Sequence, residues 1–287
     1  MQIPAYRDPD LGPTLEDLFA KAADPDALRV VVLWQRAADD RLAPELLSRP
    51  NLEIIDVPYT ESRGCGWARN LLQQHWRGEA YTLILDSHHR FAPDWDRKLV
   101  GSHEQLRHAG VSKPILTAYM PPFKPGDDPL SRSNAPLRVC PLERSHGLLI
   151  RLIGRSIPDW ETLGAAVTGD LVSLHFLFAD GVFNREIPFD PDCYFLGDEV
   201  AISLRAFTSG FDVFHPHELI GWHCYQRDYR PTHWEDHREW QDQEQLSLRT
   251  LKILFSGRYL KTYGLGRQRK LRDFEARLGL RLWDARY

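Results

Sequence analysis

The first ninety residues alternate short apolar runs with stretches of helical periodicity, and this alternation constrains the fold more than any other feature. The apolar runs have the length of strands and cover residues 2–6, 28–35, 52–57 and 81–86. Helical spacing begins near Thr14, the expected cap of the first helix, and recurs over 66–76. Strands that alternate with helices predict an α/β fold with a mostly parallel central sheet flanked by helices. In such sheets ligands bind outside the carboxyl ends of the strands.

The same pattern continues along the chain, so we predict one domain over residues 1–287. Strand-like runs at 171–178, 212–214 and 219–224 alternate with a helix at 198–209. Two closing helices (242–255 and 266–278, within about 242–287) are expected to pack on this domain. The proline-rich segment 120–137 is predicted to form a surface excursion that serves as a lid or an acceptor-binding loop.

Charge and composition exclude several classes of protein. The chain has 36 Lys and Arg against 40 Asp and Glu, a formal net charge of −4. This balance argues against a dedicated binder of nucleic acid or of an anionic membrane. The apolar runs are too short to span a bilayer, and the first residues lack the features of a signal peptide. Because the four cysteines are also too far apart for a C-x-x-C pair, we expect a cytoplasmic protein with reduced thiols.

The sharpest local feature is Asp86-Ser87-His88 at the end of an apolar strand. Residues i and i+2 of an extended chain point to the same side, so one carboxylate and one imidazole converge where the sheet opens to its ligand. This donor pair suits a divalent transition metal, Mn²⁺ above all. Alternatively, Asp86 caps the following turn and His88 is merely exposed.

A second short apolar run, 219–224, contains His223 near its end. This histidine would complete a metal site of Asp86, His88 and His223 and leave further coordination positions open, as a catalytic metal requires. The alternative is a core histidine with satisfied hydrogen bonds.

Two glycine-containing segments add candidate residues. Residues 62–70 carry Gly64 and Gly66 before a helix, where free backbone N–H groups and Arg63 or Arg69 could bind phosphate. In residues 195–205 a glycine precedes Asp198 and Glu199 at the start of another helix. These carboxylates are either ordinary first-turn acids or acceptors for sugar hydroxyls.

These motifs resemble those of the N-acetylglucosaminyltransferases that modify hydroxyproline on Skp1, and more distantly the polypeptide N-acetylgalactosaminyltransferases. The segments that carry the resemblance run in order along nearly the whole chain: 3–9 (IPAYRDP), 13–19 (PTLEDLF), 63–69 (RGCGWAR), 85–91 (LDSHHRF), 194–199 (YFLGDE), 222–225 (WHCY) and 233–236 (HWED). The resemblance implies a GT-A fold, a divalent metal (Mn²⁺ or Mg²⁺) and a UDP-sugar donor, UDP-GlcNAc first. It also implies transfer with retention to a hydroxyl of a soluble protein, peptide or small molecule.

The resemblance also implies roles for individual residues. Asp86 and His88 fall on the family's metal motif, with Ser87 between them beside the donor, and His223 falls on its late metal-binding histidine. Positions implied near the nucleotide and diphosphate are Tyr6, Arg7, Asp56, Trp67 and Arg69. Arg63 stays a donor-binding candidate on its charge alone. Asp198 and Glu199 fall on the acidic pair near the donor sugar and are the candidate catalytic residues. The family usually has two Glu there, and segment 120–137 matches no family motif, so the sequence leaves the sugar epimer and the acceptor open.

Three other functions stay open at this point. An inverting glycosyltransferase on the same fold would use Asp198 or Glu199 as the general base. A metal-dependent hydrolase would use Asp86, His88 and His223 to activate water. A sugar-binding module without catalysis would use exposed tryptophans and need no metal.

Overall fold

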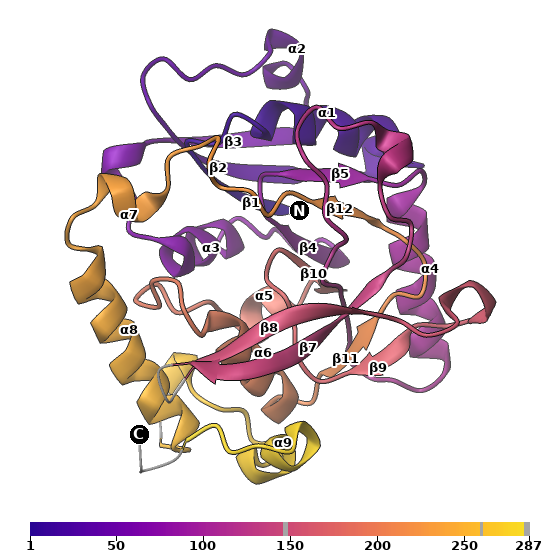
Figure 1. Ribbon diagram of the computed structural model, residues 1–287, viewed down its shortest axis with the longest axis vertical. Coiled ribbons are helices and arrows are strands. Elements are labelled where there is room, and N and C mark those ends of the chain that lie inside the picture. The colour runs from indigo at the N-terminus through magenta and orange to yellow at the C-terminus, as the bar shows by residue number, and fades with distance from the viewer. Residues whose placement is uncertain (146–148, 259–260, 284–287) are drawn as a thin grey trace.

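A computed structural model describes residues 1–145, 149–258 and 261–283 of the chain, and its centre is an eight-stranded mixed sheet (Figure 1). The strand order is β3-β2-β1-β4-β10-β6-β11-β9. The strands of this sheet are β1 (Gln2–Tyr6), β2 (Val30–Arg36), β3 (Leu52–Pro58), β4 (Tyr81–Leu85), β6 (Pro114–Thr117), β9 (Val167–Gly169), β10 (Phe176–Asp180) and β11 (Asp212–His215). The first four strands of the chain are parallel, and β11 is parallel to β6. Strands β10 and β9 run antiparallel to their neighbours, so the predicted α/β fold with a mostly parallel sheet is confirmed.

Helices cover both faces of the sheet. They are α1 (Leu11–Lys21), α2 (Pro44–Leu47), α3 (Cys65–Gln73), α4 (Trp95–His108), α5 (Phe183–Glu186), α6 (Asp198–Thr208), α7 (His233–Asp236), α8 (Trp240–Phe255) and α9 (Leu271–Leu278). Strand β2 illustrates why both faces need a covering layer of helices, because its apolar side chains alternate between the two faces. Val30 and Val32 pack in the cluster of α1 and α4, whereas Val31 and Leu33 pack against α3. Each face therefore buries its own apolar layer.

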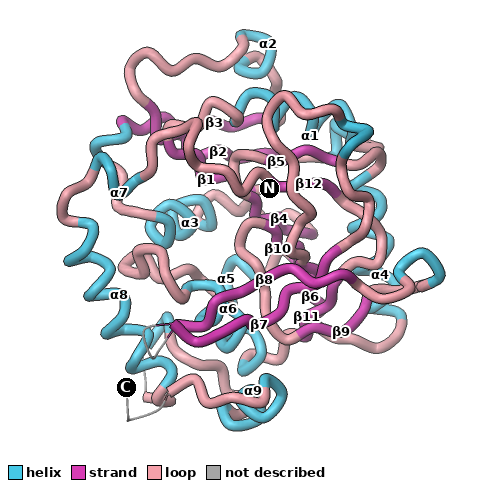
Figure 2. Tube along the Cα trace, viewed as in Figure 1, coloured by secondary structure: helices cyan, strands magenta, loops and turns pink. Residues whose placement is uncertain are grey.

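Two smaller pairs of strands lie beside the central sheet. The hairpin of β7 (Leu137–Ser145) and β8 (Leu149–Ser156) crosses the front of Figure 1 as two long antiparallel arrows. Strand β5 (His89–Phe91) pairs with β12 (Gly221–His223), which brings together segments more than 130 residues apart in sequence. Figure 2 shows the long loops that join these elements around the central strands.

The C-terminal helices pack against α6 rather than on the sheet itself. Phe207 of α6, Leu254 of α8 and Phe274 of α9 belong to one buried apolar cluster. None of the described helices has the combination of length and apolarity needed to cross a membrane.

Several expected boundaries were wrong. The first helix begins at Leu11 with Asp10 as its N-cap, because Pro13 is tolerated in a first turn. Thr14 is buried inside the helix instead, where its hydroxyl bonds the backbone of His89. Strand β10 begins only at Phe176, so most of the expected run 171–178 is loop.

Candidate functional site

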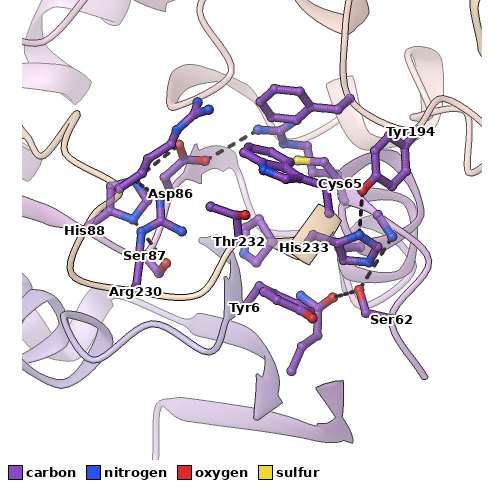
Figure 3. A pocket seen from close by; sticks show the side chains of 18 of the residues that line it. Tyr6, Ser62, Cys65, Asp86, Ser87, His88, Tyr194, Arg230, Thr232 and His233 are labelled. Carbon is purple, nitrogen blue, oxygen red and sulfur yellow. Dashed lines mark hydrogen bonds and ion pairs between the residues drawn. The ribbon is translucent and has the colours of Figure 1, made fainter. Parts of the chain in front are cut away.

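A pocket opens at the carboxyl ends of β1 and β4, where a mostly parallel sheet is expected to bind its ligand. Its walls come from β1, the start of α3, the loop after β4, the segment before α6 and the chain from β12 into α7. Figure 3 shows Asp86, Ser87, His88 and Arg230 gathered on one side of this pocket. Tyr6, Ser62, Tyr194 and His233 lie on the other side.

Asp86, His88 and His223 form a compact cluster in this pocket. One ligand-capable atom from each lies within 4.8 Å of the others. Nε2 of His223 is 3.3 Å from Oδ2 of Asp86, and Nε2 of His88 is 3.8 Å from the same oxygen. Asp86 and His88 sit between β4 and β5, and pairing of β12 with β5 brings in His223. The three residues expected from the sequence to share a metal therefore lie together.

His88 is oriented by Asp8, a residue that the sequence did not single out. Oδ2 of Asp8 is 2.7 Å from Nδ1 of His88 and also accepts a hydrogen bond of 2.6 Å from the Ser87 hydroxyl. Burial raises the pKa of Asp8, but the hydrogen bond with His88 and the nearby charges outweigh it and hold that pKa below its ordinary value. A carboxylate on Nδ1 keeps the proton there and leaves Nε2 free for a metal.

The electrostatics of the cluster suit a cation. Burial lowers the pKa of His223 to about 4, so its imidazole is neutral at pH 7. Burial would raise the pKa of Asp86, but His223, His88 and Arg69 hold it well below its ordinary value. A carboxylate and neutral imidazole nitrogens form a donor set for a divalent transition metal, so these residues fit such an ion.

Arg69 connects this cluster to the acidic pair at the start of α6. Its guanidinium bonds Oδ2 of Asp198 at 2.7 Å and lies 3.5 Å from Oδ1 of Asp86. Gly66 lets the first turn of α3 approach the loop before α6, because a Cβ there would clash with the backbone oxygens of Asp190 and Cys193. The buried arginine is thus held between two carboxylates.

Asp198 and Glu199 lie behind Arg69, and neither of these described residues lines the pocket. Oε1 of Glu199 accepts hydrogen bonds from the Ser173 hydroxyl and the Leu174 amide, at 2.8 and 3.0 Å. Burial raises the pKa of Asp198. Burial, together with the charge of Asp198, raises the pKa of Glu199 to about 7. The structure therefore places the expected catalytic pair beside the arginine rather than in the pocket.

Glu199 should make the stability of the fold depend on pH. Because its pKa is raised, the folded state binds a proton on Glu199 more tightly than the unfolded state does. The resulting contribution to the free energy of unfolding is fully present below about pH 4.5 and is lost as pH rises through 7. Between pH 5 and pH 8 the free energy of unfolding of the wild type should fall by on the order of 1–3 kcal/mol because of Glu199. In Glu199→Gln this part of the decrease should be absent, as measured by urea denaturation. Glu161→Gln, on an exposed side chain, is the control and should leave the pH dependence as in the wild type. Equal pH dependence in wild type and Glu199→Gln would contradict this assignment.

The remaining residues expected at the donor divide into two groups. Tyr6 and Ser87 line the pocket, and Tyr6 also donates a 2.8 Å hydrogen bond to Asp236. Four others do not line it. Arg7 pairs with Asp236, and Asp56 on β3 pairs with Arg36 on β2. Arg63 is exposed, and Trp67 packs with the apolar cluster under α3.

The structure adds pocket residues that were not among those predicted from the sequence. Arg227 and Arg230 bring two more cations to the pocket, from a loop without periodic pattern. Tyr194 and His233 meet across its other side, with the Tyr194 hydroxyl 2.6 Å from Nδ1 of His233. His175 stacks on His223 with ring centroids 4.4 Å apart. The sequence around His175 predicts a continuous strand, whereas in the structure His175 lies in the loop before β10.

Comparison with known proteins gives a family match over almost the whole chain. The family model described as Glycosyltransferase (GlcNAc) matches residues 1–45 and 41–283. No curated protein matches the sequence.

Solved structures give a likeness in fold. A crystal structure of GalNAc-T7 with UDP, GalNAc and Mn²⁺ superposes with a TM-score of 0.57 at 13% identity, covering 97% of this chain and 54% of that one. A crystal structure of TarS from S. aureus gives a TM-score of 0.51 at 15% identity, covering 91% of this chain and 41% of that one. The chain thus spans about half the length of these relatives or less, and the likeness confirms the predicted GT-A fold.

Proposed function

The chain belongs to the GlcNAc glycosyltransferase family and depends on a nucleotide sugar, and from this premise we propose that it transfers GlcNAc from UDP-GlcNAc to a hydroxyl group. The acceptor in this proposal is a soluble protein, peptide or small molecule. The observation that carries the proposal is the cluster of Asp86, His88 and His223 at the floor of a pocket that also contains Arg69, Arg227 and Arg230. When the sugar is transferred, the diphosphate leaves with additional negative charge. A metal ion and three arginine side chains would stabilise that charge.

The donor would lie along the pocket with its diphosphate at the metal cluster. Asp86, His88 and His223 would hold Mn²⁺ or Mg²⁺, which when bound supplies a Lewis acid for the phosphate oxygens. Arg69, fixed by its two carboxylates, adds a preorganised positive charge that needs no rearrangement during the reaction. The crystal structure of the fold relative GalNAc-T7 holds UDP and Mn²⁺, which supports this donor and metal.

The nucleotide end would occupy the opposite side of the pocket. Tyr6, Tyr194 and His233 present aromatic rings there, with the Tyr6 and His233 centroids 4.9 Å apart. Such rings can stack on a base. Arg7 would act indirectly, because it fixes Asp236 and with it the position of α7. Asp56, Arg63 and Trp67 are left out of the proposed donor contacts because they lie away from the pocket.

We favour retention of the anomeric configuration. An inverting enzyme needs a base to deprotonate the acceptor. Asp86 is the one carboxylate among the described residues that line the pocket, and it belongs to the metal cluster. Attack from the face that UDP leaves requires no further carboxylate, since a phosphate oxygen can take the proton. In this proposal Asp198 supports catalysis by holding Arg69, and neither Asp198 nor Glu199 reacts itself.

The proposal includes the cytoplasmic, reducing environment that the cysteine pattern predicts. All four cysteines are free thiols, and two of them are buried. The proposal also treats residues 1–287 as one catalytic domain, with α8 and α9 packed on α6.

The test is release of UDP from a panel of UDP-GlcNAc, UDP-GalNAc, UDP-glucose and UDP-galactose. We expect slow release with Mn²⁺, fastest from UDP-GlcNAc, and none with EDTA. Absence of release from every donor, with Mn²⁺ and with Mg²⁺, would refute the proposal. Cleavage of simple phosphoesters in place of UDP-sugars would favour the metal-dependent hydrolase. The anomer of the product, read by NMR, then distinguishes retention from inversion.

A further inference from the structure

His223 lies in a cage of aromatic rings. The centroids of His88, His89, His175 and Tyr225 are 4.7, 4.8, 4.4 and 4.4 Å from its own. This packing fixes the position of the imidazole ring. It does not decide which ring nitrogen carries the proton, and a metal ligand must keep the coordinating nitrogen unprotonated.

The two histidines of the metal cluster differ in the hydrogen-bond partner of Nδ1. His88 has Asp8 on Nδ1 at 2.7 Å, which leaves Nε2 toward Asp86. His223 also presents Nε2 to Asp86, but its buried Nδ1 has no hydrogen-bond partner among the described residues. A buried polar atom without a partner is unusual and calls for an explanation.

A second unpartnered ring touches this one. His89 is fully buried on β5, opposite His223 on β12, and neither of its ring nitrogens has a hydrogen-bond partner within the part of the chain that the structure describes. The two rings meet edge to face at 4.8 Å. The other neighbours are already engaged. Nε2 of His175 accepts from the Met120 amide, and the Tyr225 hydroxyl donates to the Met120 carbonyl.

We propose that His89 is a positioning residue for the metal centre, and that one of its nitrogens accepts the Nδ1–H of His223 and so holds Nε2 unprotonated toward Asp86. A neutral imidazole offers one acceptor nitrogen, and its χ2 torsion has a broad minimum that allows the ring of His89 to rotate toward His223. His89 would then accept the Nδ1–H of His223, just as Asp8 accepts the Nδ1–H of His88, and both histidines would keep Nε2 free for the metal. This inference rests on the proposed function, because it assumes a divalent ion at the cluster.

The test measures Mn²⁺ affinity from the electron paramagnetic resonance signal of the free ion, with and without UDP. His89→Phe keeps the ring shape and removes both nitrogens, so we expect a Kd about 10- to 100-fold higher than in the wild type. His89→Asn and His89→Gln each return an acceptor oxygen, and one of them should restore most of the affinity. The control is His103→Phe on α4, another fully buried histidine, whose ring nitrogens lie 3.5 and 3.8 Å from carboxylates of Glu104 and Asp180 and which does not line the pocket; it should leave the Kd within about twofold.

The outcomes separate this inference from the proposed function. Wild-type protein that binds Mn²⁺ while His89→Phe binds it equally well overturns the role of His89 and leaves the metal centre standing. Wild-type protein that binds no Mn²⁺, even with UDP, overturns the metal centre itself. Without metal, His89→Phe should still fold but melt at a lower temperature than the wild type, because the buried Nδ1–H of His223 loses its acceptor. If it does not fold, loss of affinity in both His89→Asn and His89→Gln contradicts the proposal.

Discussion

Replacing Arg69 with methionine should lower the stability of the fold by about 3 kcal/mol and slow UDP release by about 10²- to 10³-fold. The stability loss arises because Asp198 and Asp86 lose the cation that now lies between them, 2.7 and 3.5 Å away. The kinetic loss follows from the proposed place of the guanidinium at the diphosphate. Urea denaturation measures the first effect, and UDP release per folded molecule measures the second.

Two further variants isolate the cause. Arg205→Met removes another buried arginine, one on α6 that donates to the Pro188 carbonyl, and should destabilise the fold while leaving turnover per folded molecule close to wild type. Arg69→Lys keeps the charge but cannot span two carboxylates as a planar fork, so it should recover part of the stability and little of the rate. Wild-type turnover by Arg69→Met would contradict the role given to this residue.

Replacing Asp86 with asparagine should reduce metal-dependent UDP release by on the order of 10³-fold, with little change in stability. Asparagine preserves the shape of the side chain, but it removes the charge that faces His88, His223 and Arg69. Arg69 keeps its shorter bond to Asp198, so the fold should tolerate the change. Release of UDP at a series of Mn²⁺ concentrations measures the effect.

Asp56→Asn is the matched control for this variant. The resemblance implied that Asp56 lies near the nucleotide, but the structure places it on β3, half exposed and paired with Arg36. An exposed ion pair contributes little to stability, so Asp56→Asn should turn over like the wild type. If Asp56→Asn lost activity to the same degree as Asp86→Asn, the location of the donor site would be wrong.

The sequence predicted the parts of the fold that local patterns encode. Strands β1, β2 and β4 carry continuous apolar runs, and Asp86 and His88 follow directly after β4. The β7–β8 hairpin was not anticipated, because its stability depends on pairing between segments and on the buried cluster beneath it.

The misplaced site residues have geometric explanations. Trp67 and Arg69 are two positions apart on α3, about 200° around the helix, so they cannot both face the pocket. Arg69 faces it, whereas Trp67 packs on the apolar side. Asp8 and His89 could not be recognised in advance, because their roles depend on which rings surround them after the chain has folded.

We expect this pocket to bind the donor through a metal held by Asp86, His88 and His223. The direct measurement is calorimetric titration of UDP-GlcNAc into the protein, first with Mn²⁺ and then with excess EDTA. We expect binding with Mn²⁺, at least tenfold weaker binding with EDTA, and a similar loss for His223→Ala with Mn²⁺ present. The same affinity with Mn²⁺ and with EDTA, or no binding under either condition, would contradict the account.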